Sequence, residues 1–349
     1  MKKVLITGIL GQDGSNLAEY LLSLDEEIEV IGLTRRLSTP NYVNIKKIIN
    51  HKNFKIDYID LSDSNSIESC ISKHLPDYFV NFAANSFVGV SWSMPEQVLD
   101  VNTLGVTRCL ESIRKTKPDC RFYSAGSSEE WGNVDYSPQD INHPIKPRSP
   151  YGASKAAARH LVKVYRESYD MYAVHGILFN HEGIKRGEEF VTRKISKGVA
   201  KIKNAIDRAI GLGEEIYIAP IELGNLDAKR DWSDSRDFVE GVWLMLNQDT
   251  PKDYILASGE THSIREFIEK AFAVAGINGS WYGKGLDEVF VTGQQTLVRI
   301  NPDFYRPAEV DLLLGDSTPI REELGWKPKI SFDELVESMV KHDIHEFKE

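Results

Sequence analysis

The sequence has few cysteines, no long apolar run and no excess of positive charge. Three cysteines (Cys70, Cys109 and Cys120) among 349 residues have no paired spacing, which excludes a disulfide framework or a zinc site. No apolar run approaches the roughly 20 residues that a membrane helix needs, and Met-Lys-Lys begins the chain with no cleavable signal pattern. A net charge of −10 disfavours a large nucleic-acid footprint. We therefore expect a soluble cytoplasmic protein without a metal, a membrane or a nucleic acid as partner.

The chain does contain the alternating pattern of an α/β protein. A composition of 41% hydrophobic and 27% charged residues is ordinary for a globular chain. Short β-branched runs alternate with amphipathic stretches, which predicts an α/β fold with a Rossmann-type doubly wound parallel sheet. The expected strands are Lys3–Thr7, Glu29–Gly32, Phe54–Tyr58, Tyr78–Phe82 and Arg121–Ala125, and the expected helices are Ser15–Leu24, Ser64–Lys73, Val101–Arg114 and Tyr151–Tyr169.

A glycine-rich loop follows the first expected strand. Glycines let the backbone turn tightly and approach a pyrophosphate, which a helix N-terminus then stabilises through its amides and dipole. The loop could be a plain connection, but the order strand, loop, helix predicts a dinucleotide site. Its residues would include Gly8, Gly11, Gln12, Asp13 and Gly14.

Charged residues after the second strand predict which dinucleotide binds. Arg35 and Arg36 stand where an NAD site usually has an acidic residue, and guanidinium groups suit the 2′-phosphate of NADP. The alternative is a solvated charge pair on a loop. Asp60 and Leu61, after the third strand, could lie near the adenine, although a surface aspartate is nearly as good an interpretation. We expect NADP as the cofactor.

The alternation of strands and helices fades after about residue 180, where charged and glycine-rich loops follow. We expect residues 1–180 to form an NADP-binding Rossmann domain. Residues 181–349 would form mainly a smaller, mixed α/β domain for the substrate. Segments near residues 223–260, such as Tyr254–Ser258, resemble strands that return to the first sheet.

Reactive side chains occur at the end of the fifth strand and on the next helix. Ser127 and Glu129 follow that strand, at the edge where open α/β sheets bind ligands. Tyr151 and Lys155 are one turn apart on the same helix face. A cation that close lowers the pKa of a phenol, so Tyr151 could act as a base toward a hydroxyl group.

These features together resemble the extended short-chain dehydrogenase/reductase superfamily, and longer segments resemble its GDP-mannose 4,6-dehydratase family nearly end to end. The longer segments are Gly176–Glu182, Arg186–Ile195, Leu223–Trp232, Phe304–Asp311 and Leu324–Pro328. The resemblance implies that Tyr151 removes the 4-hydroxyl proton of the sugar while bound NADP oxidises C4. Glu129 then removes the C5 proton, water leaves from C6, and the hydride returns to C6. Ser127 would hold the 4-oxygen and Lys155 the nicotinamide ribose.

The resemblance also implies substrate contacts and an assembly. His181 would be structural, or would support a ligand-binding residue. The partners would be a GDP-sugar and further copies of the chain, as a homodimer through the helices near Val101–Arg114 and Tyr151–Tyr169, or as a homotetramer through the Arg35-Arg36 loop. The residues expected at the substrate are Ser86, Asn180, Glu182, Lys194, Arg230, Arg306 and Glu309, each of which could instead be a plain loop residue.

Four features depart from the family pattern. Ser127 replaces a threonine, and Asn85 replaces a glutamine. Glu130 could serve as an acid for the departing hydroxyl, but we favour the interpretation that it points away. Residues 203–220 form a longer segment than the family has, and because they border the sugar-nucleotide half, guanine specificity or oligomer contacts could differ.

Three alternatives stay open. The first is the same reaction on a related sugar nucleotide such as GDP-D-glycero-D-manno-heptose. The second is a 4-keto-sugar reductase or an epimerase, which would keep Tyr151 and Lys155 but would not need Ser127 with Glu129. The third is a non-catalytic dinucleotide sensor, which the four intact reactive residues disfavour.

Overall fold

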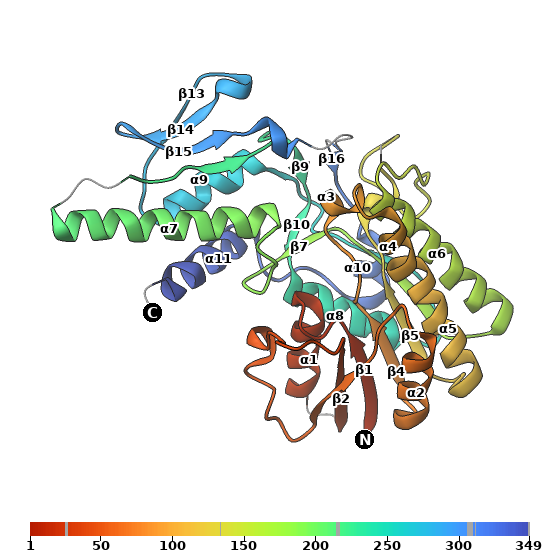
Figure 1. Cartoon of the computed structure of the whole chain (residues 1–349). Helices are drawn as coiled ribbons and strands as arrows, with labels where there is room; N and C mark the ends of the chain where they lie inside the picture. The colour runs from red at the N-terminus through yellow and green to blue at the C-terminus, as the bar shows by residue number, and fades with distance from the viewer. Residues whose placement is uncertain (25–26, 133, 214–216, 306–309, 311, 348–349) are drawn as a thin grey trace.

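The computed structural model describes residues 1–24, 27–132, 134–213, 217–305, 310 and 312–347 (Figure 1). A seven-stranded sheet, in the order β11-β6-β5-β4-β1-β2-β3, has only parallel pairs. The predicted α/β class and doubly wound parallel sheet are confirmed. The strands are β1 Lys2–Thr7, β2 Ile28–Thr34, β3 Phe54–Tyr58, β4 Tyr78–Asn81, β5 Arg121–Ala125, β6 Ala173–Leu178 and β11 Tyr254–Leu256.

Helices cover both faces of this sheet, so its strands are apolar on both sides. On one face, α1 (Gln12–Ser23) and α8 (Ser235–Leu246) enclose a core that includes Leu17 and Val242. On the other face, α2 (Ser64–His74), α5 (Gly105–Thr116) and α6 (Pro150–Tyr169) enclose a core that includes Phe79, Ile113 and Val162. The sheet is therefore packed between two apolar cores.

Two helix starts differ from the sequence prediction by more than one residue. The helix expected from Val101 begins at Gly105, because Asp100–Leu104 forms a π-helical segment after α3 (Val88–Ser91) and α4 (Pro95–Leu99). The helix expected from Ser15 begins at Gln12, directly after the extended residue Gly11. Gln12 and Asp13 therefore belong to the first turn of α1.

The second half contains more regular structure than expected. The prediction that loops follow residue 180 is wrong. The charged residues lie on the exposed faces of helices, and the apolar faces of the same helices pack together. Figure 1 shows these elements beside the large sheet. They are α7 Val191–Leu212, α9 Ile264–Val274, α10 Thr318–Leu324, α11 Phe332–Glu346, and a sheet of β13 Ser280–Tyr282, β14 Val289–Thr292, β15 Gln295–Ile300 and β8 Ile221–Leu223.

Short strands connect the two halves. β7 (Asn180–Glu182) pairs in parallel with β10 (Trp232–Asp234). The expected return of the 254–258 region to the first sheet is confirmed, since β11 pairs with β6. Because the chain crosses back in this way, the division near residue 180 stays a proposal. The remaining short elements are β9 Lys229–Arg230, β12 His262–Ser263, β16 Leu312–Leu313 and the 3₁₀ turns Val43–Ile45, Ser128–Glu130, Gly285–Asp287 and Pro302–Phe304.

None of the described helices is long and apolar enough to cross a membrane.

Candidate active site

A cavity of about 1000 Å³ lies at the carboxyl edge of the large sheet and extends to α7 and β9. Loops after parallel strands meet at this edge, which is why residues distant in sequence share one wall. Fourteen residues expected at a site line it: Gly8, Gly11, Gln12, Asp13, Gly14, Ser86, Ser127, Glu129, Tyr151, Lys155, Asn180, Glu182, Lys194 and Arg230.

A second cavity of about 160 Å³ shares the glycine loop with the first. Arg35, Asp60 and Leu61 line it, as expected for residues near the adenosine end of a dinucleotide. Hydrogen bonds from Ser62 lower the pKa of Asp60. Arg36 lines neither cavity; it is exposed and donates to the Leu37 carbonyl oxygen at 3.0 Å. Of the expected guanidinium pair, only Arg35 lies at this site.

The glycine loop is tightly closed. Gly8 has a φ of +68°, and the Gly11 amide donates to the Gly8 carbonyl oxygen at 2.9 Å. A Cβ atom on Gly14 would lie 2.4 Å from that same oxygen. Only a loop without side chains at these positions can bring the N-terminus of α1 this close to the end of β1.

Two polar atoms in the cavity wall fit a bound polar ligand. Gln12 Oε1 and Asn180 Oδ1 are buried and have no hydrogen-bond partner in the part of the chain that the structure describes. Buried polar atoms nearly always have partners. Gln12 Oε1, directly after the glycine loop, fits a dinucleotide that would supply a donor, and Asn180 Oδ1, on β7, fits a hydroxyl group of the substrate.

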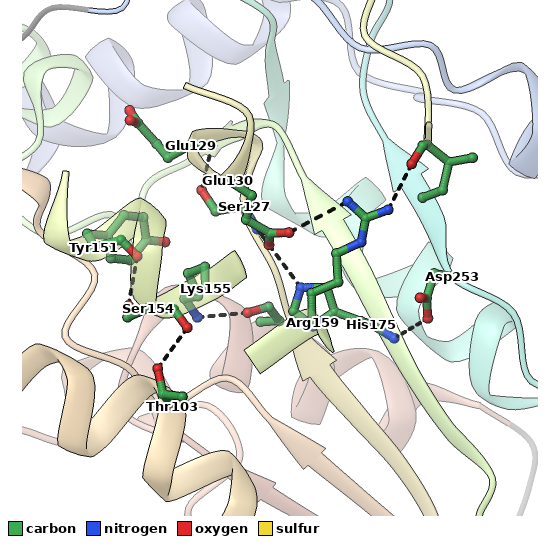
Figure 2. A network of polar contacts seen from close by, with 12 residues as sticks. Thr103, Ser127, Glu129, Glu130, Tyr151, Ser154, Lys155, Arg159, His175 and Asp253 are labelled. Carbon is green, nitrogen blue, oxygen red and sulfur yellow. Dashed lines mark hydrogen bonds and ion pairs between the residues drawn. The ribbon is translucent and has the colours of Figure 1, made fainter. Parts of the chain in front are cut away.

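The first turns of α6 position Tyr151 and Lys155. The Ser149 hydroxyl accepts from the Gly152 amide at 3.0 Å, and Pro150 begins the helix. Lys155 Nζ donates to the Ala125 carbonyl oxygen at 2.7 Å and lies 5.8 Å from the centre of the Tyr151 ring (Figure 2). Burial lowers the pKa of Lys155 to about 8, although the nearby Glu130 and Asp13 act in the opposite direction.

The phenol of Tyr151 is a weaker acid than expected. Burial raises the pKa of Tyr151 to about 12, against a hydrogen bond with Ser127 that lowers it. The expected lowering of this pKa below its usual value is wrong for the chain by itself, because the net shift is upward. The ammonium group binds the Ala125 carbonyl instead, and burial has the larger effect.

A capping turn separates the two neighbouring glutamates. Ser127 Oγ accepts from the Glu129 amide at 3.2 Å, and Glu130 Oε1 accepts from the Ser127 amide at 2.8 Å. This turn leaves Glu129 half-buried at the cavity and directs Glu130 away from it (Figure 2). Ser127 thus keeps its hydroxyl beside both Glu129 and Tyr151.

Glu130 belongs to the protein core. It is fully buried, with Oε1 at 2.9 Å from His175 Nε2 and Oε2 at 3.9 Å from Arg159 Nη1. Burial alone would raise the pKa of Glu130, but His175 and Arg159 hold it below its usual value. The favoured interpretation, that Glu130 points away from the chemistry, is confirmed.

The expected substrate residues differ in how available they are. Lys194, on the first turn of α7, lies with Nζ 3.6 Å from the centre of the Phe304 ring, and burial lowers its pKa. Arg230, on β9, donates to the Lys229 carbonyl oxygen at 2.9 Å. The Glu182 carboxylate accepts from Thr192 at 2.5 Å and pairs with Arg186 at 3.0 Å. Arg306 and Glu309 lie outside the described residues.

Among the cavity residues that the sequence did not predict, three form a group of one cation and two aromatic rings. The Arg186 guanidinium lies 3.5 Å from the centre of the Phe190 ring, and Phe87 contacts that ring edge-on at 5.7 Å. All three line the large cavity. Phe87 follows β4 at the same sheet edge as the glycine loop and Ser127, so the strand-end argument applied to β4 would have found it.

The longer segment at residues 203–220 lies away from the cavity. Lys203–Leu212 continue α7 beyond its first turn, and among the described residues of the segment none lines either cavity. The segment belongs to the expected sugar-nucleotide half, but the long α7 carries its described residues away from the cavity, since each residue adds about 1.5 Å along a helix axis. The expected effect on guanine specificity or oligomer contacts stays a prediction.

The doubly wound sheet, the glycine loop and a Tyr–Lys pair beside Ser127 define an enzyme of the extended short-chain dehydrogenase/reductase class that takes a nicotinamide dinucleotide. A family model described as GDP-mannose 4,6 dehydratase matches residues 5–339. The chain belongs to the GDP-mannose 4,6-dehydratase family.

Individual relatives agree with this family. GDP-mannose 4,6 dehydratase of Drosophila melanogaster is 45% identical over 353 residues, covering 98% of this chain and 86% of the relative. The protein of that name from Homo sapiens is 43% identical, covering 97% of this chain and 91% of the relative. The crystal structure of DesIV, a dTDP-glucose 4,6-dehydratase from Streptomyces venezuelae with NAD and TYD bound, matches the fold with a TM-score of 0.81 at 21% identity, over 97% of this chain and 96% of that one.

Proposed function

We propose that this chain is a GDP-mannose 4,6-dehydratase that converts GDP-D-mannose into GDP-4-keto-6-deoxy-D-mannose. One observation carries the proposal. A single cavity combines the glycine loop with Ser127, Glu129, Tyr151 and Lys155 and with the basic side chains of Lys194 and Arg230. The family membership supports the same reaction and substrate.

The glycine loop would hold the diphosphate of the dinucleotide at the N-terminus of α1. Lys155 would bind the nicotinamide ribose, and Arg35 the 2′-phosphate of NADP. When bound, the cofactor supplies an oxidant for C4 and returns the same two electrons at C6, so that no cofactor is consumed. Asp60 and Leu61 would line the adenine side.

Tyr151 would take the proton of the 4-hydroxyl as C4 becomes a ketone. Its raised pKa means that the phenol is protonated at neutral pH in the chain alone. Cationic charge beside the ring lowers such a pKa, and the Lys155 ammonium group is placed to add to this cationic charge. The Ser127 hydroxyl would hold the 4-oxygen through both protonation states.

Glu129 would carry out the elimination. A 4-ketone acidifies the C5 proton, which the half-buried carboxylate at the cavity wall would remove. Expulsion of the C6 hydroxyl with one proton gives water and a C5–C6 double bond. Reduction at C6 and return of a proton to C5 complete the 6-deoxy sugar. Of the neighbouring glutamates, only Glu129 can do this, since Glu130 is buried against His175.

Lys194 and Arg230 would bind the diphosphate of the sugar nucleotide, for which ammonium and guanidinium groups are suited. Asn180, with its buried and unpaired Oδ1 among the described residues, would bind a sugar hydroxyl. Ser86 would contact the sugar from the loop after β4. Glu182 would act mainly by orienting Arg186, because its carboxylate already has two partners.

Purified protein incubated with GDP-mannose, without added reduced cofactor, tests the reaction. Mass spectrometry should show a sugar nucleotide that has lost one water. E129Q should slow product formation by about 100-fold or more, yet still develop the absorbance of a reduced nicotinamide, because C4 oxidation does not need Glu129. Y151F should lose both signals. Normal product formation by E129Q would contradict the assignment and favour a reductase or an epimerase. A wild-type reaction only with GDP-D-glycero-D-manno-heptose would correct the substrate.

The choice of NADP over NAD is tested by titrating the chain with each dinucleotide. NADP should bind at least about tenfold more tightly than NAD. The reason is that the charged hydrogen bond from Arg35 to the 2′-phosphate is absent when NAD is bound. The matched variant R36S should keep the preference, because Arg36 lies outside both cavities. Equal affinities in the wild type would contradict the NADP part of the proposal.

A homo-oligomer is also part of the proposal. Large apolar side chains are 43–50% exposed at the ends of α4 and the π-helical segment and along α6: Leu99, Leu104, Val164 and Tyr169. Exposed apolar patches on packed helices are typical of subunit interfaces. The cytoplasm is the proposed location, supported by three free thiols, Cys70, Cys109 and Cys120, all buried and none in a disulfide.

A further inference from the structure

The imidazole of His181 joins the substrate strand β7 to the glycine loop. Its Nδ1 lies 2.7 Å from the Phe179 carbonyl oxygen, and its Nε2 lies 3.0 Å from Asp13 Oδ2. The ring stacks on Phe238 of α8, with 4.8 Å between ring centres. Because side chains alternate along a strand, His181 faces α1 while its neighbours in β7 face the other way.

Gln12 also contributes to the contact between β7 and the glycine loop. Its Nε2 donates to the His181 carbonyl oxygen at 3.0 Å and to Asp13 Oδ1 at 3.1 Å. The first two residues of α1 therefore bind both the main chain and the side chain of His181. All three residues line the large cavity.

The partners of the imidazole require it to be a cation. A carbonyl oxygen and an ionised carboxylate only accept hydrogen bonds, so both ring nitrogens must donate. The pKa directions agree: Asp13 raises the pKa of His181 against burial, and His181 lowers that of Asp13 against burial. The other titratable groups near the pair are Arg186, Lys155 and Tyr123.

An uncompensated Asp13 would oppose the binding of a dinucleotide. Its carboxylate lies in the first turn of α1, where the glycine loop would take a diphosphate, and like charges at this range repel. We propose that His181 is a positioning residue that cancels the charge of Asp13 and fixes the glycine loop to β7, so that this loop accepts the dinucleotide. The inference rests on the proposed function in that a dinucleotide is the ligand.

A double-mutant cycle tests the proposal on binding rather than on activity. NADP⁺ is titrated by calorimetry into the wild type, H181Q, D13N and the double variant D13N/H181Q. H181Q should bind about tenfold more weakly, because Asp13 is then uncompensated. The double variant should return close to the wild-type affinity, since both charges are gone. A purely structural role predicts the opposite, with the double variant binding no better than H181Q.

The chain offers a matched control for H181Q. His74 Nε2 lies 2.7 Å from Asp57 Oδ2 at similar exposure, but neither residue lines a cavity. H74Q should leave the affinity for NADP⁺ unchanged. Circular dichroism and thermal melting of the apo variants report folding.

Each outcome decides the proposal. Unchanged binding by H181Q, or no recovery in the double variant, overturns it. If H181Q does not fold, D13N alone decides, because it should bind as tightly as the wild type or more tightly; weaker binding overturns the proposal. Failure of the wild type to bind either NADP⁺ or NAD⁺ would instead overturn the cofactor assignment, on which this inference rests.

Discussion

At the residue scale, the site places a cation where it is electrostatically unfavourable. Lys155 is buried beside Tyr151, and its one hydrogen bond in the described structure is to a neutral carbonyl group, that of Ala125. Burial of the ammonium lowers its pKa to about 8. Such residues are retained for chemistry at a cost in stability. The cost should be measurable in the free energy of unfolding.

K155M should therefore stabilise the chain at pH 7. The unfolded chain binds the Lys155 proton up to about pH 10.5, whereas the folded chain releases it near pH 8. The stability of the wild type thus rises with pH between these values. A shift of this size corresponds to about 3 kcal/mol, and loss of the bond to Ala125 offsets about 1 kcal/mol. Urea unfolding should show K155M to be roughly 1–3 kcal/mol more stable at pH 7, with the difference shrinking by pH 9.5.

A matched lysine gives the control. Lys163, on α6 like Lys155, is exposed and pairs with the exposed Glu167 on the surface, so K163M should change the unfolding free energy little. Its small effect should also be the same at both pH values. If K155M were less stable than the wild type by the same amount at pH 7 and pH 9.5, the conclusion that the buried charge of Lys155 lowers the stability of the chain would be wrong.

At the element scale, the junction of β1 with α1 depends on close backbone contact. Gly14 is helical, so its role is steric: an added Cβ would lie 2.4 Å from Gly8 O and 2.9 Å from the Ile9 Cα. Neither backbone group can move without displacing β1 from the sheet. The glycine loop is thus determined by packing between elements as well as by its ligand.

G14A should destabilise the chain by about 1–3 kcal/mol, the usual cost of overpacking, and should weaken dinucleotide binding. Thermal melting and titration with NADP⁺ measure the two effects. Gly211 near the end of α7 gives the control, because its Cβ would meet nothing within 4 Å. G211A should be neutral or stabilising by about 0.5–1 kcal/mol. Identical melting temperatures for G14A and G211A would refute the steric role.

At the scale of the whole molecule, helices that cover the sheet also present apolar side chains outward. Leu104 and Val164 are each 50% exposed, on the π-helical segment and on the active-site helix α6, which pack against each other. An interface there would bury this apolar surface on the helix that carries Tyr151 and Lys155. The proposed oligomer therefore bears on the site as well as on stability.

L104D/V164D should shift the chain toward the monomer, because charges in an apolar interface cost several kcal/mol. Size-exclusion chromatography with light scattering at micromolar concentrations measures the mass. I210D is the control, since Ile210 is exposed on α7, away from these helices. A wild type that is already monomeric, or a double variant that keeps its mass, would contradict the proposed interface.

The sequence by itself determined the sheet, the glycine loop and the Ser127, Glu129, Tyr151 and Lys155 set, because these depend on short-range patterns. Period-two and period-3.6 hydrophobicity, a helix start and a one-turn spacing are all local. The two neighbouring glutamates show the limit of such reasoning. Glu129 lies at the cavity and Glu130 lies in the core. This difference depends on a capping turn and on His175, which is 45 residues from Glu130 in the chain.

The tertiary structure alone decided the charge state and the partners of these groups. Burial sets the pKa of Tyr151 and Lys155, and burial is a property of the packed core rather than of sequence spacing. Contacts across 168 residues bring His181 to Asp13. The apolar faces of α7 and α11 became recognisable only when they packed together. Long-range packing determines dielectric environment and proximity, and no local pattern encodes either.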